Sequence, residues 1–399
     1  MASIVKGLSQ NGHAVDLLVE EDRGWLLDTL RSYNSNINII NLRPYYYSGM
    51  FHYCFLAVAI LRNLASAPYT LIQRGDSCLA PLIRTIIKEK PPIHSLYGYI
   101  HQHRPDTIMS FLNYPNLVLL LTAQLCGNKT RFFVNVRNHI SSSAKNAKSK
   151  WMRSVPRIMR CYYHLADKIV APSYGVAEDI AKITGLPLDH ITVIHNPVFR
   201  PEILTQAKQP VEHPWLNQDK IPVIVAAGKL KPQKDFKTLL RAFALVRSER
   251  PVRLIILGEG RCRTELMGLS KELMISSDVD FAGYVQNPHS FYSRASLFVL
   301  SSAWEGLPNA LIEAMTCGCP VVSTDCPSGP AEILDNGSIG KLVPVGDEKF
   351  MAEAIIETLE SPPPRDKIVE RARIFSFDKA IKQYEHLMTT DFQKEDNTS

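Results

Sequence analysis

The segment Leu297–Thr324 constrains the fold more than any other part of the chain. It opens with the apolar run Leu297–Ser302, which is short enough for a buried parallel strand. Apolar residues recur at helical spacing over Leu311–Met315, and Gly318 ends this helix before a second apolar run, Pro320–Thr324. A strand, a helix and another strand in this order predict one unit of a parallel α/β sheet.

The same alternation of strand-like and helical segments continues on both sides of this unit. With 399 residues, the chain is long enough for two or three domains, each with its own core. The other predicted strands are His13–Val19, Ile37–Leu42, Pro105–Phe111, Arg131–Val136, Ala166–Ser173, Pro222–Ala227, Arg253–Leu257 and Asp280–Val285, and Ile191–Pro197 closes the first domain. This pattern predicts an α/β fold of two Rossmann-like, doubly wound domains that face each other across a cleft.

A change in composition marks the boundary between the two domains. Residues 198–220 are rich in Pro, Gln and other polar residues and lack a clear period, so we interpret them as a linker. Residues 1–197 then form the first domain and residues 221–375 the second. The last segment, 376–399, is predicted to be a helix that crosses back to the first domain, followed by a frayed polar tail.

Two carboxylates flank the loop that joins the strand and the helix of the opening segment. Glu305 lies in the loop itself, Pro308 in the predicted first helical turn, and Glu313 about one turn further on. Unpaired backbone N–H groups and the positive end of a helix dipole make such a corner suitable for a phosphate group. The plainer alternative is that both acids interact only with the helix dipole and with water.

A second candidate phosphate-binding segment follows the strand that opens the second domain. There Gly228 is followed by Lys229, a turn and Lys234 before the next helix. Two glycines after the following strand, Gly258 and Gly260, allow a ligand to approach the backbone closely. The full Rossmann glycine fingerprint is absent, which argues against a dinucleotide enzyme. Taken alone, the two lysines could equally be surface residues.

Together, the Glu-x7-Glu string Glu305–Glu313 and the Gly-Lys-Leu…Lys string Gly228–Lys234 resemble the motifs of one known family. This family is the retaining glycosyltransferases of the GT-B fold, of the family 4 (group 1) type. The resemblance covers nearly the whole chain from residue 2 onward and is most specific over Gly228–Asp347. It implies a first domain that binds the acceptor and a second that binds a nucleotide sugar. The family's first strand and glycine-rich loop have no counterpart here, because the chain opens with the predicted helix Ala2–Gln10.

The resemblance also implies roles for individual residues. In the family the first Glu faces the donor sugar and the second holds the ribose hydroxyls, which gives these roles to Glu305 and Glu313. An Arg and a Lys clamp the donor diphosphate, and Lys229 and Lys234 stand at these positions, although Lys229 lacks the bidentate fork of Arg. The backbone over Gly283–Val285 borders the nucleobase in the family. The implied donor site comprises Gly228, Lys229, Lys234, Gly258, Gly283, Tyr284, Val285, Glu305, Gly306, Leu307, Pro308, Asn309 and Glu313.

The resemblance defines the acceptor side less closely. The predicted strand Arg131–Val136 is followed by Arg137 and His139, and the carboxyl ends of strands face the ligand in open α/β sheets. Both residues are therefore candidates for a place near the donor phosphate or sugar. The alternative for His139 is a loop histidine bound to the backbone. The predicted catalytic residues are Glu305, Lys234, Lys229, His139 and Arg137.

The resemblance implies the transfer of a hexose-type sugar from a nucleotide-diphosphate sugar, with retention of configuration. Lysines and loop N–H groups would stabilise the leaving diphosphate, so we expect neither a metal ion nor another cofactor. No Asp-x-Asp motif or His cluster is placed to bind a metal at this position. The alternatives are a sugar-nucleotide epimerase, a phosphorylase, for which we locate no pyridoxal lysine, and a catalytically eroded relative that only binds sugar nucleotides.

Residues 144–163 combine basic and apolar side chains in an amphipathic pattern. The basic residues are Lys145, Lys148, Lys150, Arg153, Arg157 and Arg160. Docking of this segment to anionic lipid head groups would suit an enzyme with a glycan or polyprenyl- or other lipid-linked acceptor, whereas a solvated helix face is the alternative. The formal charge of +6 also favours an anionic partner, but we expect no nucleic acid partner.

Several features bear on where the protein acts. The sequence has no run of 18 apolar residues, and its first residues lack a signal-peptide core. Eight cysteines occur without a Cys-x-x-Cys pair, which favours buried reduced thiols. We expect a cytoplasmic enzyme, peripheral on the inner membrane face, that builds a surface polysaccharide, lipopolysaccharide or glycolipid. The aromatic loop Pro44–Tyr47 could stack on a sugar, lie at the membrane surface or pack in the core.

Overall fold

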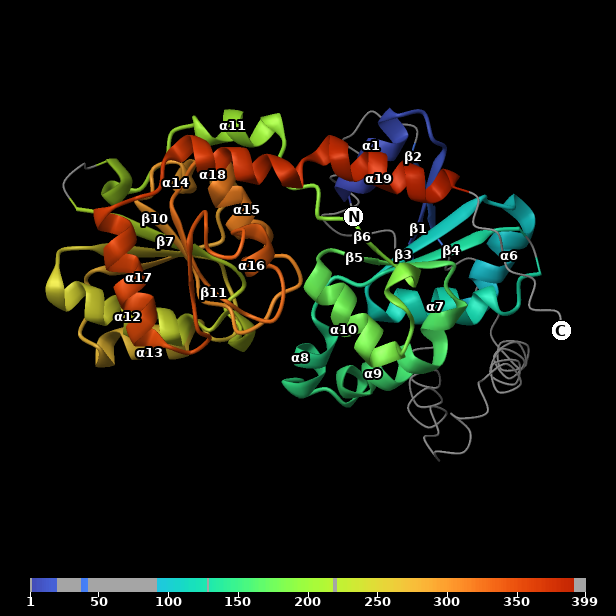
Figure 1. Ribbon diagram of the computed structural model, residues 1–399, viewed down its shortest axis with the longest axis horizontal. Coiled ribbons are helices and arrows are strands. Elements are labelled where there is room, and N and C mark those ends of the chain that lie inside the picture. The colour runs from blue at the N-terminus through green and yellow to red at the C-terminus, as the bar shows by residue number, and fades with distance from the viewer. Residues whose placement is uncertain (1, 20–36, 42–91, 128, 218–220, 391–399) are drawn as a thin grey trace. The chain divides into compact units, whose positions relative to one another are not determined.

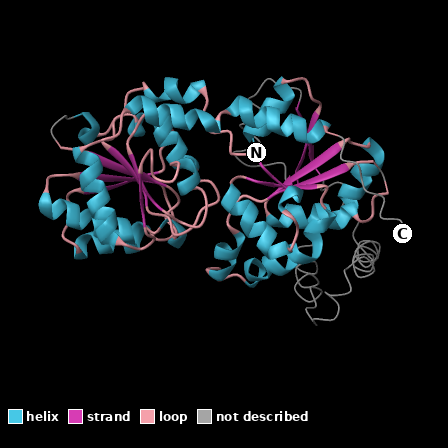
Figure 2. Ribbon diagram, viewed as in Figure 1, coloured by secondary structure: helices cyan, strands magenta, loops and turns pink. Residues whose placement is uncertain are grey.

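The computed structural model describes residues 2–19, 37–41, 92–127, 129–217 and 221–390 (Figure 1). Its contacts divide the chain into two compact units. Unit 1 comprises Met1–Ala171, Ala177–Ile194 and Asp378–Ser399, and unit 2 comprises Pro172–Val176 and His195–Phe377. Each unit contains parallel strands flanked by helices (Figure 2), so the predicted α/β class with two doubly wound units is confirmed.

The described residues of unit 1 form two parallel sheets. The larger has the strand order β3-β4-β5-β6, and the smaller pairs β1 with β2. The strands are β1 Val15–Val19, β2 Ile37–Asn41, β3 Thr107–Phe111, β4 Arg131–Asn135, β5 Lys168–Ala171 and β6 Ile191–Val193. The helices are α1 Ala2–Gln10, α6 Ile93–His103, α7 Asn113–Ala123, α8 Ile140–Lys145, α9 Lys150–Tyr162, α10 Tyr174–Thr184 and α19 Phe377–Thr389. The described chain thus opens with a helix followed by a strand, in the predicted order.

Helix α19 belongs to unit 1 through its apolar face. The buried residues Ala380, Ile381, Tyr384 and Leu387 recur at helical spacing. The Tyr384 hydroxyl donates to Asn135 Oδ1 at 3.0 Å, at the carboxyl end of β4. The guanidinium of Arg131 donates to the backbone carbonyls of Met388 and Thr390. It thereby gives hydrogen-bond donors to carbonyl groups that have no partner within the helix.

Unit 2 contains one six-stranded parallel sheet with the order β12-β11-β10-β7-β8-β9. Its strands are β7 Val223–Ala227, β8 Arg253–Leu257, β9 Val279–Gly283, β10 Leu297–Leu300, β11 Val321–Thr324 and β12 Lys341–Val343. Its helices are α11 Pro201–Ala207, α12 Phe236–Glu249, α13 Arg263–Glu272, α14 His289–Tyr292, α15 Asn309–Thr316, α16 Pro330–Ile333, α17 Glu348–Glu360 and α18 Arg365–Ala372.

Both faces of this sheet are buried, which explains its continuous apolar strands. Val223, Val225 and Ala227 of β7 pack into one core with α11, α14, α15, α16 and α18. The alternate residues Ile224 and Ala226 pack into the other core with α12, α13 and α17. Successive side chains of a strand point to opposite faces, so every residue of β7 is buried.

Two predictions differ from the structure described here, and one predicted segment lies outside the described residues. The predicted linker 198–220 contains α11, whose Ile203 and Ala207 are buried, because Pro201 at its first position favours a helix start. Five cysteines of the described residues are free, but Cys161 is disulfide-bonded, so the prediction of reduced thiols is wrong for that residue. The aromatic loop Pro44–Tyr47 lies outside the described residues.

Candidate functional site

The turn after β7 is built around the side chain of Lys234. Gly228 follows the strand with φ 153°, and a Cβ atom on it would lie 2.9 Å from Cε of Lys234. A one-turn 3-10 helix, η5 Pro232–Lys234, then leads to Asp235, which adopts the left-handed conformation. Only a glycine therefore lets Lys234 extend across the backbone at the end of β7.

A second turn, after β8, rests directly on the first. A Cβ atom on Gly258 would lie 2.1 Å from the carbonyl oxygen of Gly228, and one on Gly260 would lie 2.3 Å from that of Leu230. The Leu230 N–H donates to the Glu259 carbonyl at 2.9 Å. Because β7 and β8 are neighbours, their turns share one rigid backbone layer in which side chains at these glycines have no room.

Lys234 and Glu305 form a close ion pair in this layer. Lys234 Nζ lies 2.5 Å from Glu305 Oε1, and the two side chains are only 15% and 9% exposed. The hydroxyl of Ser302 donates to the same carboxylate oxygen at 2.6 Å. Two of the predicted site residues, 71 positions apart in the sequence, are therefore in direct contact.

Neighbouring polar groups hold the two partners in place, and the sequence alone did not single them out. The Ser301 hydroxyl donates to the Lys234 carbonyl at 2.7 Å, and Gln233 Nε2 donates to the Trp304 carbonyl at 2.7 Å. The Ser328 hydroxyl donates to the Glu305 carbonyl at 2.9 Å. The only signal in the sequence was a pair of serines directly after an apolar strand.

The loop after Glu305 presents backbone N–H groups at the start of α15. Among the described residues, no hydrogen bond engages the N–H groups of Gly306, Leu307, Asn309 and Ala310. Pro308 caps α15 and so lies just before the helix, not in its first turn as predicted. Asn196 Nδ2 donates to Asn309 Oδ1 at 2.6 Å, which fixes the first helical residue. These N–H groups and the helix dipole form a seat for an anion.

Glu313 has different neighbours from Glu305. It is half-buried on α15, and burial raises the pKa of its carboxyl, while the Arg200 guanidinium acts in the opposite direction. Burial also raises the pKa of Tyr292 on α14, and the negative charge of Glu313 adds to this effect. The two acids therefore have different neighbours in unit 2: Glu305 lies beside Lys234, and Glu313 lies beside α14.

The end of β9 supplies the third edge of the candidate donor site. Gly283 has φ 76°, and a Cβ atom on it would lie 2.8 Å from Oε1 of Glu259. Tyr284, which follows it, is 81% exposed. An exposed aromatic ring at the carboxyl end of a strand is available to stack on a planar ligand. The nearby Val285 is half-buried and packs against the core.

The two acceptor-side candidates follow β4 in unit 1. His139 is the N-cap of α8, where its Nδ1 accepts from the Ser142 N–H at 3.3 Å and lies 3.6 Å from Asp179. Arg137 lies over the Phe111 ring at 5.9 Å and hydrogen-bonds the Tyr384 phenol. The backbone-bound histidine of the alternative interpretation is thus observed, and a catalytic role for either residue stays a prediction.

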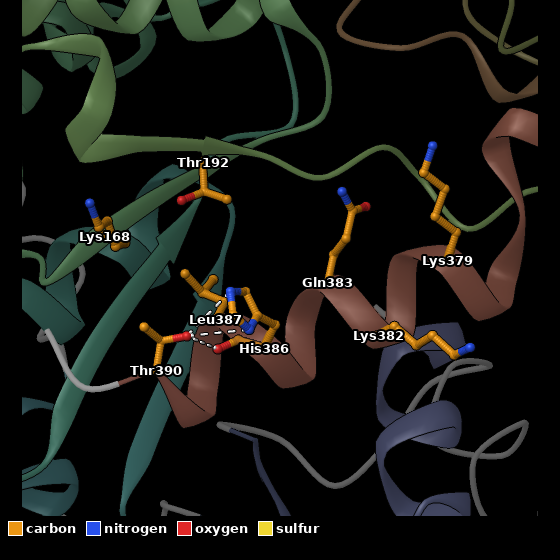
Figure 3. A pocket seen from close by; sticks show the side chains of 8 residues that line it. All are labelled: Lys168, Thr192, Lys379, Lys382, Gln383, His386, Leu387 and Thr390. Atoms are coloured by element: carbon orange, nitrogen blue, oxygen red, sulfur yellow. Dashed lines mark hydrogen bonds between the residues drawn. The ribbon is translucent and has the colours of Figure 1, made fainter.

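A hollow of about 500 Å³ lies elsewhere in unit 1 (Figure 3). It is lined by Lys168, Thr192, Lys379, Lys382, Gln383, His386, Leu387 and Thr390, none of which is a predicted site residue. Lys168 is the first residue of β5, so the hollow lies away from the carboxyl ends of the strands. In Figure 3 the ammonium group of Lys168 lies apart from those of Lys379 and Lys382, and Lys382 points away from Lys379, so the three do not converge on one anion site.

The described part of the chain offers neither a cluster of metal ligands nor a membrane span. No group of three or more His, Cys, Asp or Glu side chains gathers there in a way that could hold a metal ion. Within the same residues, no helix combines the length and the apolar character needed to cross a bilayer.

Two family sequence patterns match the chain. The pattern described as "Glycosyl transferases group 1" matches residues 209–375, and the pattern described as "Glycosyltransferase Family 4" matches residues 1–199. The first pattern includes the turn Gly228–Lys234 and the loop that contains Glu305. The second includes β4 together with Arg137 and His139, which follow it.

The chain is also similar to individual glycosyltransferases. The chain is 31% identical over 277 residues to the N-acetylgalactosamine-N,N'-diacetylbacillosaminyl-diphospho-undecaprenol 4-alpha-N-acetylgalactosaminyltransferase of Campylobacter jejuni, covering 69% of this chain and 73% of that protein. It is 30% identical over 210 residues to the lipopolysaccharide core biosynthesis glycosyltransferase LpsE of Rhizobium meliloti, covering 53% and 59%. The solved structure of Anabaena Alr3699/HepE in complex with UDP and glucose superposes with a TM-score of 0.69, at 16% identity and over 98% and 95% of the two chains, and so shows the fold alone.

Proposed function

The chain belongs to the group 1 glycosyltransferases with a family 4 amino-terminal half, and on this premise we propose a specific reaction. It transfers a hexose-type sugar from a nucleotide-diphosphate sugar to a glycan or lipid-linked acceptor. The anomeric configuration is retained, and neither a metal ion nor another cofactor takes part. The acceptor assignment is supported by the names of the Campylobacter and Rhizobium relatives, which refer to a diphospho-undecaprenol-linked acceptor and to the lipopolysaccharide core.

The Lys234–Glu305 ion pair is the observation that carries this proposal. A lysine ammonium has three N–H donors, and one of them is used by Oε1 of Glu305. Among the described residues, both side-chain contacts of the carboxylate fall on Oε1, so Oε2 can accept a hydrogen bond from a sugar hydroxyl. The remaining donors of Lys234 can bind phosphate oxygens. The pair thus holds the sugar and the phosphate at adjacent positions, where the bond between them breaks.

The proposed reaction follows from this placement. The bond between the anomeric carbon and the phosphate oxygen breaks, and its electron pair goes to the diphosphate. Lys234, Lys229 and the N–H groups of the Gly306–Asn309 loop stabilise this charge through fixed positive potential in a site shielded from water. The acceptor hydroxyl forms the new bond on the same face, and its proton passes to the departing diphosphate. Arg137 and His139 are proposed to act on the acceptor side.

A donor screen tests the proposed function directly. The protein is incubated with a panel of nucleotide-diphosphate sugars and a labelled pool of lipid-linked acceptors, and nucleoside diphosphate release is followed. Acceptor-dependent release with a labelled glycolipid product is the expected result. Conversion of the donor sugar without release would instead identify an epimerase. Tight donor binding without either change would identify a catalytically eroded relative.

Glu313→Gln is expected to stabilise the unliganded protein and weaken nucleotide binding at the same time. The folded-state pKa of Glu313 lies above its usual 4.5, so its charge destabilises the fold as the pH rises through that value. The variant should therefore melt at a higher temperature than the native protein at pH 7 but not at pH 4. Loss of the charged acceptor for the ribose hydroxyls should weaken nucleotide affinity by about 10-fold or more.

Calorimetry and thermal melting measure both effects, with the exposed Glu272→Gln on α13 as the control. Unchanged nucleotide affinity in Glu313→Gln would remove the ribose role. An unchanged melting temperature at pH 7 would contradict the burial argument.

We keep membrane docking of residues 144–163 in the proposal, but limit it to the side chains that are exposed. Their apolar members Val155, Ile158 and Met159 on α9 are buried within unit 1. These three side chains cannot enter a bilayer while the unit stays folded, so docking would rest chiefly on exposed charge. The exposed basic residues are Lys145, Lys148, Lys150, Arg153, Arg157 and Arg160. We propose a cytoplasmic protein that associates peripherally with the inner membrane face through this surface.

Neutralising three of these charges is expected to reduce binding to anionic vesicles strongly at low salt. Each charge near such a surface contributes about 1 kcal/mol, so Lys148→Gln, Lys150→Gln and Arg153→Gln together should weaken binding by about 100-fold. Vesicle sedimentation measures this, with Lys271→Gln, Lys349→Gln and Lys367→Gln in unit 2 as a control of equal charge change. Equal binding by the two triple variants would contradict a specific role for this surface.

A further inference from the structure

Lys231 lies on the same turn as Lys229 and Lys234, yet the motif assigns it no role. Its side chain is half-buried, and its charged neighbours are Lys234, Glu305 and Lys229. Within the described residues, its ammonium forms neither a hydrogen bond nor an ion pair, since Glu305 is paired with Lys234. The turn therefore holds a third cation that has no protein anion of its own.

This arrangement is unfavourable in the absence of a ligand. Burial lowers the pKa of Lys231 below its usual 10.5, and the positive charges of Lys234 and Lys229 lower it further, while Glu305 has the opposite effect. A half-buried ammonium beside two like charges is stabilised when an anion binds next to it. Its position is thus suited to a negatively charged ligand.

The charges of the turn match one chemical group. Lys234 is compensated by Glu305, which leaves Lys229 and Lys231 as the two uncompensated cations. The diphosphate bridge of a nucleotide-diphosphate sugar carries one negative charge on each phosphate. We infer that Lys231 is a further diphosphate-binding residue. It supplies the positive charge that Lys234 cannot supply in full, because Lys234 is paired with Glu305. This inference rests on the proposed function, because it concerns the same donor.

The backbone presents Lys231 from a fixed position. The residue before it is held on both sides, since the Leu230 N–H donates to the Glu259 carbonyl and the Leu230 carbonyl accepts from the Cys262 N–H at 3.1 Å. The Lys231 carbonyl accepts from the Lys234 N–H at 3.0 Å. These contacts use only main-chain atoms of residues 230 and 231, so they survive a change of the Lys231 side chain. A substitution there is expected to change ligand affinity and to leave the fold intact.

The test compares Lys231→Met with Lys231→Arg and with the matched control Lys237→Met. Lys237 lies on the adjacent α12, is exposed and pairs with Glu265, outside the turn. The probes are the diphosphates of uridine, guanosine, adenosine and thymidine, of which the tightest binder to the native protein is used, together with the matching nucleoside. Binding is measured by calorimetry at one fixed low salt concentration.

Lys231→Met is expected to weaken diphosphate binding by about 10-fold or more, and nucleoside binding by less than about twofold. Lys231→Arg should stay within about threefold of the native protein, because it keeps the charge. Diphosphate affinity in Lys231→Met equal to that of Lys237→Met would overturn the inference and leave the proposed function standing. Failure of the native protein to bind any of the four diphosphates would instead overturn the proposed function, and the inference with it.

Discussion

Lys234→Ala is expected to lower turnover by about 10²-fold or more. The variant removes the ammonium that is placed to stabilise the leaving diphosphate. It also removes the partner of Glu305, whose side chain is only 9% exposed. Breaking a buried ion pair by deleting one partner costs about 3–5 kcal/mol, so the melting temperature should fall as well.

The two effects of this variant can be separated. The double variant Lys234→Met with Glu305→Gln removes both charges, so it restores stability without restoring the cation at the phosphate. Turnover should remain low in the double variant while its melting temperature returns toward that of the native protein. The control is Lys237→Ala, which changes the same charge outside the turn. An unaltered rate in Lys234→Ala would remove this residue from the mechanism.

Gly258→Ala is expected to cause the largest loss of stability. A Cβ atom there would lie 2.1 Å from the Gly228 carbonyl oxygen, and the residue has φ 135°, which an L side chain rarely adopts. The contact with the Gly228 carbonyl cannot relax without moving the backbone of the neighbouring turn. Backbone strain of this kind costs about 1–3 kcal/mol, and overpacking costs a similar amount. We expect a loss of about 3 kcal/mol or more, together with loss of nucleotide binding.

Gly268→Ala provides the matched control. Gly268 lies within α13, and a Cβ atom on it meets nothing within 4 Å. Alanine is the better helix former by about 1 kcal/mol, so this variant should be slightly more stable than the native protein. Denaturant unfolding of unit 2, followed by tryptophan fluorescence, compares the two. Equal stability of the two alanine variants would show that the turns after β7 and β8 do not touch as described.

The sequence predicted the class of fold because burial leaves a local trace. Strands of a parallel sheet that are covered on both faces must be apolar at every position, as β7 and β10 are. Such runs, separated by amphipathic helices and glycine-rich turns, can be recognised without knowing which strands pair. The same locality explains the motif residues, since Gly228, Lys234 and Glu305 all lie in the segments that follow apolar strands, at the edge where ligands bind in such sheets.

The partners of those residues were decided only by the tertiary structure. Lys234 meets Glu305, and Gln233 meets the Trp304 carbonyl, across 71 positions of sequence, because the strand order places β7 beside β10. No periodicity or spacing encodes that crossover. The sequence therefore did not predict that Ser302 and Lys231 lie beside a buried ion pair and not in solvent. The sequence by itself determined which residue types stand at the strand ends. Only the order of the strands decided which of them touch, because the energy of a buried charge depends on what lies next to it in space.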